Sequence, residues 1–119
     1  MKVLFLNPPF ADYAGLKGHG GKALPLNLAY IASYLRQQQP EIDLSVLDCE
    51  ALNLNFDKIE TRVNEIGPDV VAMTAPTPAY AQVVTVAERI KNIDRNIQVV
   101  LGGPHPAALP EETVREKSI

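Results

Sequence analysis

Short apolar runs alternate along the chain with segments of helical periodicity. Three of the runs are nearly continuous and rich in β-branched residues, namely residues 3–6, 70–73 and 97–101. Such runs are typical of parallel strands that are covered on both faces. A fourth run, residues 42–47, alternates apolar with polar positions, so one face of this strand is wetter. We therefore expect the fourth run to form a strand at an edge of the sheet.

Between these runs, apolar residues recur at spacings of three and four, which predicts amphipathic helices. The pattern covers residues 24–35, 56–66 and 83–90. Asn55 or Asp57 could cap the second of these helices, because a short polar side chain at a helix start accepts a hydrogen bond from a free backbone N–H. A further helix should begin near residue 110.

The resulting order, in which four strands alternate with four helices, predicts an α/β domain with a parallel sheet. A buried first strand beside an edge-like second strand fits a flavodoxin-like (Rossmann-like) three-layer sandwich with the sheet order 2-1-3-4. The complete version of this order has a fifth strand, which is missing here. We therefore expect residues 1–119 to be a truncated N-terminal part of a longer protein, although a natural end at this point is an alternative. The fourth strand would then be an exposed edge through which a dimer could form.

Length and charge exclude several classes of protein. The 119 residues fit one domain, and the net charge of −3 argues against a nucleic-acid-binding module. No apolar run approaches the roughly 20 residues of a membrane span. The single cysteine, Cys49, excludes an internal disulfide and favours the cytoplasm. Cys49 follows a strand and has no activating neighbour in the sequence, so we expect it to be buried and inert.

The glycines and prolines have an uneven distribution. The chain has 7 glycines and 10 prolines, and all but Pro40, Gly67 and Pro68 follow the C-terminal ends of the predicted strands. Open α/β sheets bind their ligands at that end. The segment after the first strand, from residue 7 to about residue 23, is much longer than a usual connection. It is either an ordinary surface loop or a loop that orders over a ligand.

Two further loops at this end carry candidate ligand-binding groups. Thr74 and Thr77 could hydrogen-bond a polar ligand, although Thr77 could instead cap the following helix. Gly102 and Gly103 could let a flat ligand approach the backbone, although a purely structural turn is the alternative. His105 lies alone between two prolines and is expected to be an exposed loop histidine without a metal.

No catalytic constellation is visible in the sequence. It contains no GxxxxGK[ST] phosphate loop, no GxGxxG dinucleotide turn and no GxSxG nucleophile elbow. The residues by themselves therefore predict a small-molecule-binding domain. An autonomous enzyme acting on a small phosphorylated or nucleotide substrate is disfavoured, because no acid–base pair or nucleophile is present.

Five segments in this order resemble the N-terminal cobalamin-binding domain of the radical S-adenosylmethionine enzymes, in particular the branch with the anaerobic magnesium-protoporphyrin IX monomethyl ester cyclase. No single segment is specific, but the series covers essentially the whole chain. The segments are residues 3–10, 24–35, 46–51, 68–74 and 99–106.

The resemblance implies a cobalamin on the C-terminal ends of the strands. Its nucleotide tail would pass the glycine pair and the hydroxyl of Thr74, and its corrin ring would face the segment after the first strand. S-adenosylmethionine and a [4Fe-4S] cluster would belong to a downstream radical domain, so no metal ligand or catalytic residue is expected in this chain. The candidate cofactor-binding residues are Asn7, Pro8, Pro9, Thr74, Thr77, Gly102, Gly103, Pro104 and His105.

One departure from related cobalamin domains leaves two functions open. Domains of the methionine synthase type carry Asp-x-His-x-x-Gly after the first strand, and their histidine ligates the cobalt. Here the corresponding Asp12-Tyr13-Ala14 lacks that histidine, so this loop is not expected to ligate the lower face of a cobalamin. The chain is then either the cobalamin-binding module of a cyclase-like or methyltransferase-like radical enzyme, or a cofactor-free interaction or regulatory domain with the same fold.

Overall fold

A four-stranded, all-parallel sheet forms the centre of the computed structural model, which describes residues 1–9 and 24–119. The strand order is β2-β1-β3-β4, so the predicted order is confirmed, and β2 lies at an edge as its alternating pattern indicated. The strands are β1 (Lys2–Asn7), β2 (Asp43–Asp48), β3 (Val70–Thr74) and β4 (Gln98–Gly102).

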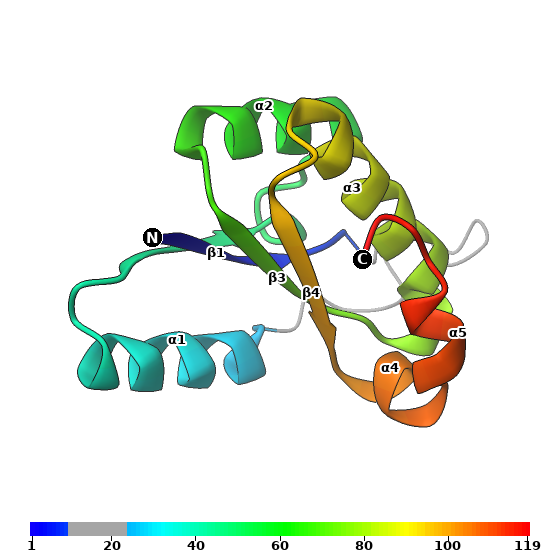
Figure 1. Ribbon diagram of the computed structural model, residues 1–119, viewed down its shortest axis with the longest axis horizontal. Helices are drawn as coiled ribbons and strands as arrows, with labels where there is room; N and C mark the ends of the chain where they lie inside the picture. Colours follow the sequence, from blue (N-terminus) through cyan, green and yellow to red (C-terminus); the bar gives the residue numbers. More distant parts are fainter. Residues whose placement is uncertain (10–23) are drawn as a thin grey trace.

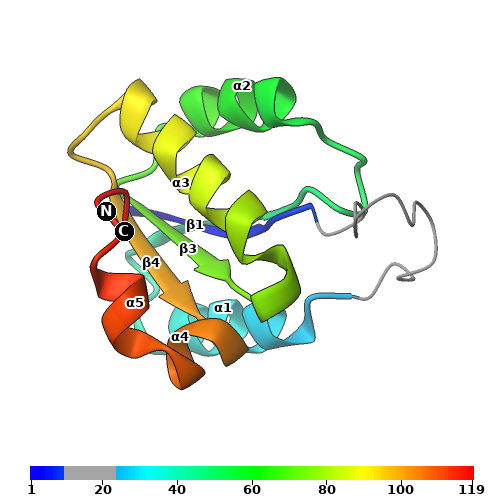
Figure 2. The ribbon, with the colours of Figure 1, turned by 90° about the vertical axis from the view of Figure 1, so that its right-hand side faces the viewer.

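Helices cover both faces of the sheet and complete a three-layer α/β fold of the flavodoxin-like type (Figure 1). Helix α1 lies on one face and helices α2 and α3 lie on the other. Two short helices, α4 and α5, follow the carboxyl end of β4 (Figure 2). The helices are α1 (Leu26–Gln38), α2 (Phe56–Ile66), α3 (Tyr80–Ile93), α4 (Pro104–Ala108) and α5 (Pro110–Val114), and a 3-10 turn, η1 (Thr77–Ala79), precedes α3.

Two hydrophobic clusters lie on opposite faces of the sheet, because successive side chains of a strand point to opposite sides. In β1, Leu4 and Leu6 join the larger cluster, which includes buried residues of α2 and α3. Val3 and Phe5 join a smaller cluster whose helical members are two residues of α1, Leu28 and Ala32. The α1 face is therefore the more thinly covered of the two.

Local signals in the sequence explain how α2 begins and ends. The side chain of Asn55 accepts a hydrogen bond from the backbone N–H of Lys58 at 2.9 Å, so Asn55 is the cap of this helix. At the other end, Gly67 adopts a left-handed conformation with φ of 59°, which glycine reaches without strain. Asp57, the alternative cap, lies inside the helix.

Asp57 instead joins α2 to α3 through Arg89. The Arg89 guanidinium donates to Asp57 at 2.6 Å and to Glu60 at 3.2 Å, and it lies 5.5 Å from the centre of the Phe56 ring. The hydrogen bond that Arg89 donates to Asp57, followed by the charges of both carboxylates, raises the pKa of Arg89. This contact holds the two helices together on the larger cluster.

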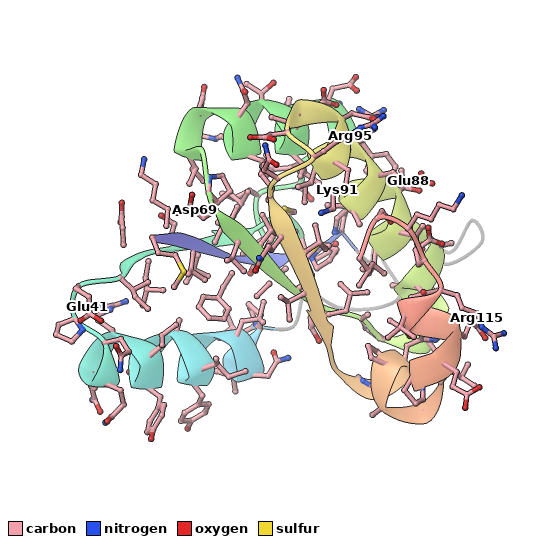
Figure 3. The ribbon with its side chains drawn as sticks, viewed as in Figure 1. Glu41, Asp69, Glu88, Lys91, Arg95 and Arg115 are labelled. Atoms are coloured by element: carbon pink, nitrogen blue, oxygen red, sulfur yellow. The ribbon has the colours of Figure 1, made fainter. Side chains whose placement is uncertain are left out.

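Polar contacts also hold the amino ends of the strands. Lys91, near the end of α3, donates from Nζ to the carbonyl oxygen of Ile97 at 2.6 Å, just before β4 begins (Figure 3). Asp69 accepts a hydrogen bond from the backbone N–H of Lys2 at 2.7 Å, just before β3. These contacts lie at the end of the sheet opposite the glycine-rich segments, so they serve the fold.

The α1 side of the sheet leaves apolar groups in contact with solvent. Val46 on β2 and Val100 on β4 are about half exposed, at 49% and 50%. Helix α1 also exposes Tyr30, Ile31 and Tyr34. A single helix is too narrow to cover four strands, so the two outer strands remain open on this face. Among residues 1–9 and 24–119, no helix combines the length and the apolar character that a membrane crossing needs.

Candidate functional site

The carboxyl ends of β1 and β3 form the topological switch point of the sheet. The helix that follows β1 covers one face, and the helix that follows β3 covers the other, so the two connections diverge at this point (Figure 1). Open α/β sheets bind ligands in the crevice between such connections. Asn7 ends β1 and Thr74 ends β3, so the structure brings these two predicted residues to neighbouring strand ends.

Asn7 has little contact with solvent, with 2% of its surface exposed. Its side-chain Nδ2 donates to Asp48 Oδ1 at 2.9 Å, and the same oxygen accepts from the backbone N–H of Ala51 at 3.1 Å. Asp48 thus fixes the Asn7 amide at the carboxyl end of β1. The neighbouring Pro8 is buried and Pro9 is half-buried. The segment with Asp12-Tyr13-Ala14 lies outside the described residues.

Thr74 is the polar group at the end of β3, with 9% of its surface exposed. Its Oγ1 accepts a hydrogen bond from Nδ2 of Asn27 at 3.2 Å. Asn27 lies in the first turn of α1 and was not among the residues that the sequence predicted for the site. No local pattern marks Asn27, because its partner is 47 residues away and comes close only when α1 packs on the sheet.

The glycine pair at the end of β4 has two distinct roles. Gly103 adopts a φ of 97°, which side chains disfavour. A Cβ atom at Gly103 would lie 2.8 Å from Thr74 Oγ1 and 3.2 Å from the backbone nitrogen of Ala75. A Cβ atom at Gly102, by contrast, would have no atom within 4 Å. Gly103 therefore permits a close approach of two loops, whereas Gly102 leaves its backbone open.

Thr77 does not cap the helix that follows, so that alternative for its role is wrong. Pro76 occupies the cap position of η1 and no side chain donates or accepts a capping hydrogen bond there. Thr77 begins η1 and is exposed. Its hydroxyl lies on the loop after β3 and is accessible to a ligand or to water.

His105 is buried, which contradicts the expectation of an exposed loop histidine. Pro104 begins α4, so the chain turns into a helix where the sequence suggested a loop. His105 is 3% exposed, and its side chain stacks on the ring of Tyr80, with centroids 3.7 Å apart and the planes at 19°. Its Nε2 lies 3.7 Å from Glu112, and neither ring nitrogen has a hydrogen-bond partner among the described residues. Its backbone N–H donates to Ala75 at 2.9 Å, so His105 packs the wall behind the site.

Cys49 is fully buried just after β2, as expected for an inert thiol. Burial raises the pKa of Cys49 to about 12, and the negative charge of Asp48 acts in the same direction. A thiol in this state is neither a nucleophile nor a metal ligand at neutral pH. Within the described part of the chain, no group of three or more His, Cys, Asp or Glu side chains is placed to hold a metal ion.

The site therefore offers neutral polar groups and an open stretch of backbone. In the sheet register, Thr74 pairs with Gly102, and Asn7 lies on the adjacent strand. The Asn7 amide, the Thr74 hydroxyl and the Gly102 backbone can hydrogen-bond or contact a polar ligand that enters between the loops. This donor set suits binding and orientation of a ligand rather than acid–base catalysis.

Comparison with known proteins gives matches over most of the chain. The profile of a family described as the B12 binding domain matches residues 18–119. An uncharacterized methyltransferase of Pyrococcus horikoshii is 40% identical over 116 residues, which are 98% of this chain and 24% of that protein. The anaerobic magnesium-protoporphyrin IX monomethyl ester cyclase of Rubrivivax gelatinosus is 28% identical over 116 residues, which are 98% of this chain and 20% of that protein. The chain thus spans about a quarter or less of the length of these relatives.

Proposed function

The chain belongs to the B12-binding domain family, and from this premise we propose that it holds a cobalamin at the carboxyl ends of its strands. The observation that carries the proposal is the approach of Gly103 to Thr74 beside the open backbone of Gly102. Because neither Gly102 nor Gly103 carries a side chain, a bulky ligand can reach the strand ends. The residues present fit the neutral polar surface that such a ligand needs.

Each candidate residue has a proposed place around the cofactor. The Thr74 hydroxyl and the Gly102 backbone would bind the nucleotide tail, since they lie side by side at the ends of β3 and β4. Asn7, with Pro8 and Pro9 after it, would face the corrin ring. Thr77 and Pro104 are exposed at the rim of the same end, whereas the buried His105 supports the rim from behind.

The chemistry of such a module comes from the cofactor. A bound cobalamin supplies a cobalt centre for radical or group-transfer reactions. The residues of this chain bind it, orient it and exclude water from its buried part. Asn7 and Thr74 do these tasks with uncharged groups, so the binding we propose does not depend on a proton at either side chain.

We also propose that the domain serves a longer radical S-adenosylmethionine enzyme of the cyclase-like or methyltransferase-like kind. The support is the resemblance of its motifs to that group of enzymes and the names of the two relatives, a methyltransferase and a cyclase. In this proposal S-adenosylmethionine and a [4Fe-4S] cluster bind to the downstream domain, which is the partner of the cobalamin. A Cys-x-x-x-Cys-x-x-Cys motif in the reading frame after residue 119 would support it, and a frame without one would contradict it.

A direct test of cobalamin binding uses the purified chain. The protein is mixed with hydroxocobalamin, desalted, and examined by visible spectroscopy. We expect corrin absorbance to remain with the protein at up to one equivalent per chain. A Gly102→Leu variant is the comparison and should retain less cobalamin. Its side chain would fill the open space above the backbone, and its Cβ would meet no other protein atom. Equal retention by the two proteins would contradict the proposed location of the cofactor.

A cofactor-free interaction domain is the second candidate function. The observation that favours it is the open edge of β4, where Val100 is half exposed and Gln98, Val99 and Leu101 carry no charge. Uncharged edge strands are templates for pairing with another chain. A stable dimer in light scattering, together with no retained corrin absorbance, would support this function over the first.

A further inference from the structure

We propose that Asn27 is a positioning residue of this site, which fixes the hydroxyl of Thr74 for hydrogen bonding to the cofactor; this inference rests on the proposed cobalamin function. Asn27 Nδ2 lies 3.2 Å from Thr74 Oγ1 and donates to it. The contact joins the first turn of α1 to the end of β3. It is therefore a link between elements that diverge at the switch point.

The surroundings of Thr74 leave its hydroxyl few orientations. Thr74 is nearly buried, and its Oγ1 lies close to the backbone of Gly103. A Cβ atom added to Gly103 would be only 2.8 Å from this oxygen. Since the oxygen accepts the amide hydrogen of Asn27, the hydrogen of the hydroxyl is left to donate elsewhere. Within the described part of the chain, the Thr74 hydroxyl donates to no protein acceptor. It is thus available to an acceptor on the ligand, such as a phosphate or ribose oxygen.

The local context of Asn27 supports a role beyond the helix itself. Asparagine near a helix start usually serves as a cap, but α1 has no side-chain capping hydrogen bond. Inside a helix, asparagine is a poorer helix former than alanine. The Asn27 side chain therefore does not stabilise α1 itself, and it donates a hydrogen bond to Thr74 instead.

The test is a double-mutant cycle on the dissociation constant for hydroxocobalamin. It compares the wild type with Asn27→Ala, Thr74→Val and the double variant. We expect Asn27→Ala to raise the dissociation constant about 3- to 10-fold, which is the loss that one hydrogen bond typically causes. Because Asn27 acts through Thr74, the double variant should bind no more weakly than Thr74→Val alone.

A second substitution distinguishes positioning from simple loss of a side chain. Asn27→Asp has nearly the same shape, but its carboxylate can only accept, so the Thr74 hydroxyl would donate to it and lose its donor for the ligand. Asn27→Asp should therefore weaken binding at least as much as Asn27→Ala. Gln37→Ala, at the far end of α1, is the control and should bind like the wild type. Circular dichroism and the melting temperature check that each variant is folded.

The outcomes separate this inference from the function on which it rests. A wild type that retains no cobalamin overturns both. A wild type that binds, with Asn27→Ala and Asn27→Asp unchanged, overturns the positioning role alone. Additive losses in the double variant also overturn it, because they would show that Asn27 acts independently of Thr74.

Discussion

Gly103 adopts a backbone conformation, φ 97° and ψ −168°, that is almost restricted to glycine. The sequence predicted that the glycine pair matters, but it could not distinguish the two residues. The distinction depends on Thr74, which is far away in the chain and approaches only in the folded sheet. The sequence therefore shows where the glycine-rich loop lies, but the role of each glycine depends on its contacts in the folded protein.

This difference predicts unequal effects of alanine at the two positions. Gly103→Ala should lower the free energy of unfolding by about 1–3 kcal/mol, because it adds backbone strain and a contact with Thr74. Gly102→Ala should change it by less than about 1 kcal/mol, since its Cβ would enter open space. Urea unfolding followed by circular dichroism measures both values. Equal losses in the two variants would contradict this assignment of roles.

The buried thiol of Cys49 predicts a pH-dependent difference in stability. The pKa of Cys49 rises from 9.0 to about 12 on folding. Above pH 9 the unfolded chain releases this proton and the folded chain keeps it, so stability falls as pH rises. Between these two pKa values the free energy of unfolding should fall by about 1.4 kcal/mol per pH unit, until the folded thiol itself ionises.

Cys49→Ala provides the comparison, because it lacks only this titration. Urea unfolding at pH 8, 9 and 10 should show a steeper loss of stability for the wild type than for the variant. Parallel curves would contradict the expected protection of the thiol. Iodoacetamide should likewise label the native protein at pH 8 much more slowly than the urea-unfolded chain.

The histidine and asparagine at the site show where residue-scale prediction ends. His105 appeared to be a loop residue because prolines flank it, yet Pro104 begins a helix that buries the ring against Tyr80. Asn27 was not among the residues predicted for the site. Both outcomes depend on a partner from another element, and a single sequence carries no local signal for such a partner.

Helices and strands were predicted more completely than individual contacts. The strands follow from short apolar runs, three of them nearly continuous and one alternating, and the three long helices follow from apolar spacings of three and four. Both patterns are local and extend over several residues. Helix α4 was not predicted, because its 5 residues are too few for a periodic pattern and include two prolines. The sheet order then followed from the burial pattern of the runs, because an alternating second run indicates an edge strand beside a buried first strand.

The cap of α2 gives a test at this scale. Asn55→Ala removes the acceptor for the Lys58 backbone N–H and should lower the free energy of unfolding by about 1 kcal/mol. Asn64→Ala, on the exposed side of the same helix, makes the same chemical change without a cap and is the control. Chemical denaturation of both variants should therefore show a loss for Asn55→Ala only. A similar loss in both would argue against the capping role.

At the scale of the whole molecule, the edge of β4 is the feature with the clearest consequence for assembly. If the uncharged edge pairs with a second copy, as the sequence suggested, light scattering should show a dimer whose fraction rises with concentration. Val100→Lys should shift it to the monomer, because a lysine on an edge strand opposes pairing. Val46→Lys places the same charge on the opposite edge strand, β2, and should leave the dimer intact. A wild type that is monomeric at all concentrations would exclude this mode of association.

The two faces of the sheet differ in how much buried apolar surface holds their helices, and this difference affects the dynamics of the helices. Helix α1 is held by a small cluster with only two buried residues of its own, whereas α2 and α3 share the larger one. Segments with little buried apolar contact open first in native-state hydrogen exchange. The amides of α1 should thus exchange faster than those of α3. Because Asn27 links α1 to Thr74, a ligand at the strand ends should slow exchange in α1 most, so ligand binding and docking of this helix are thermodynamically coupled.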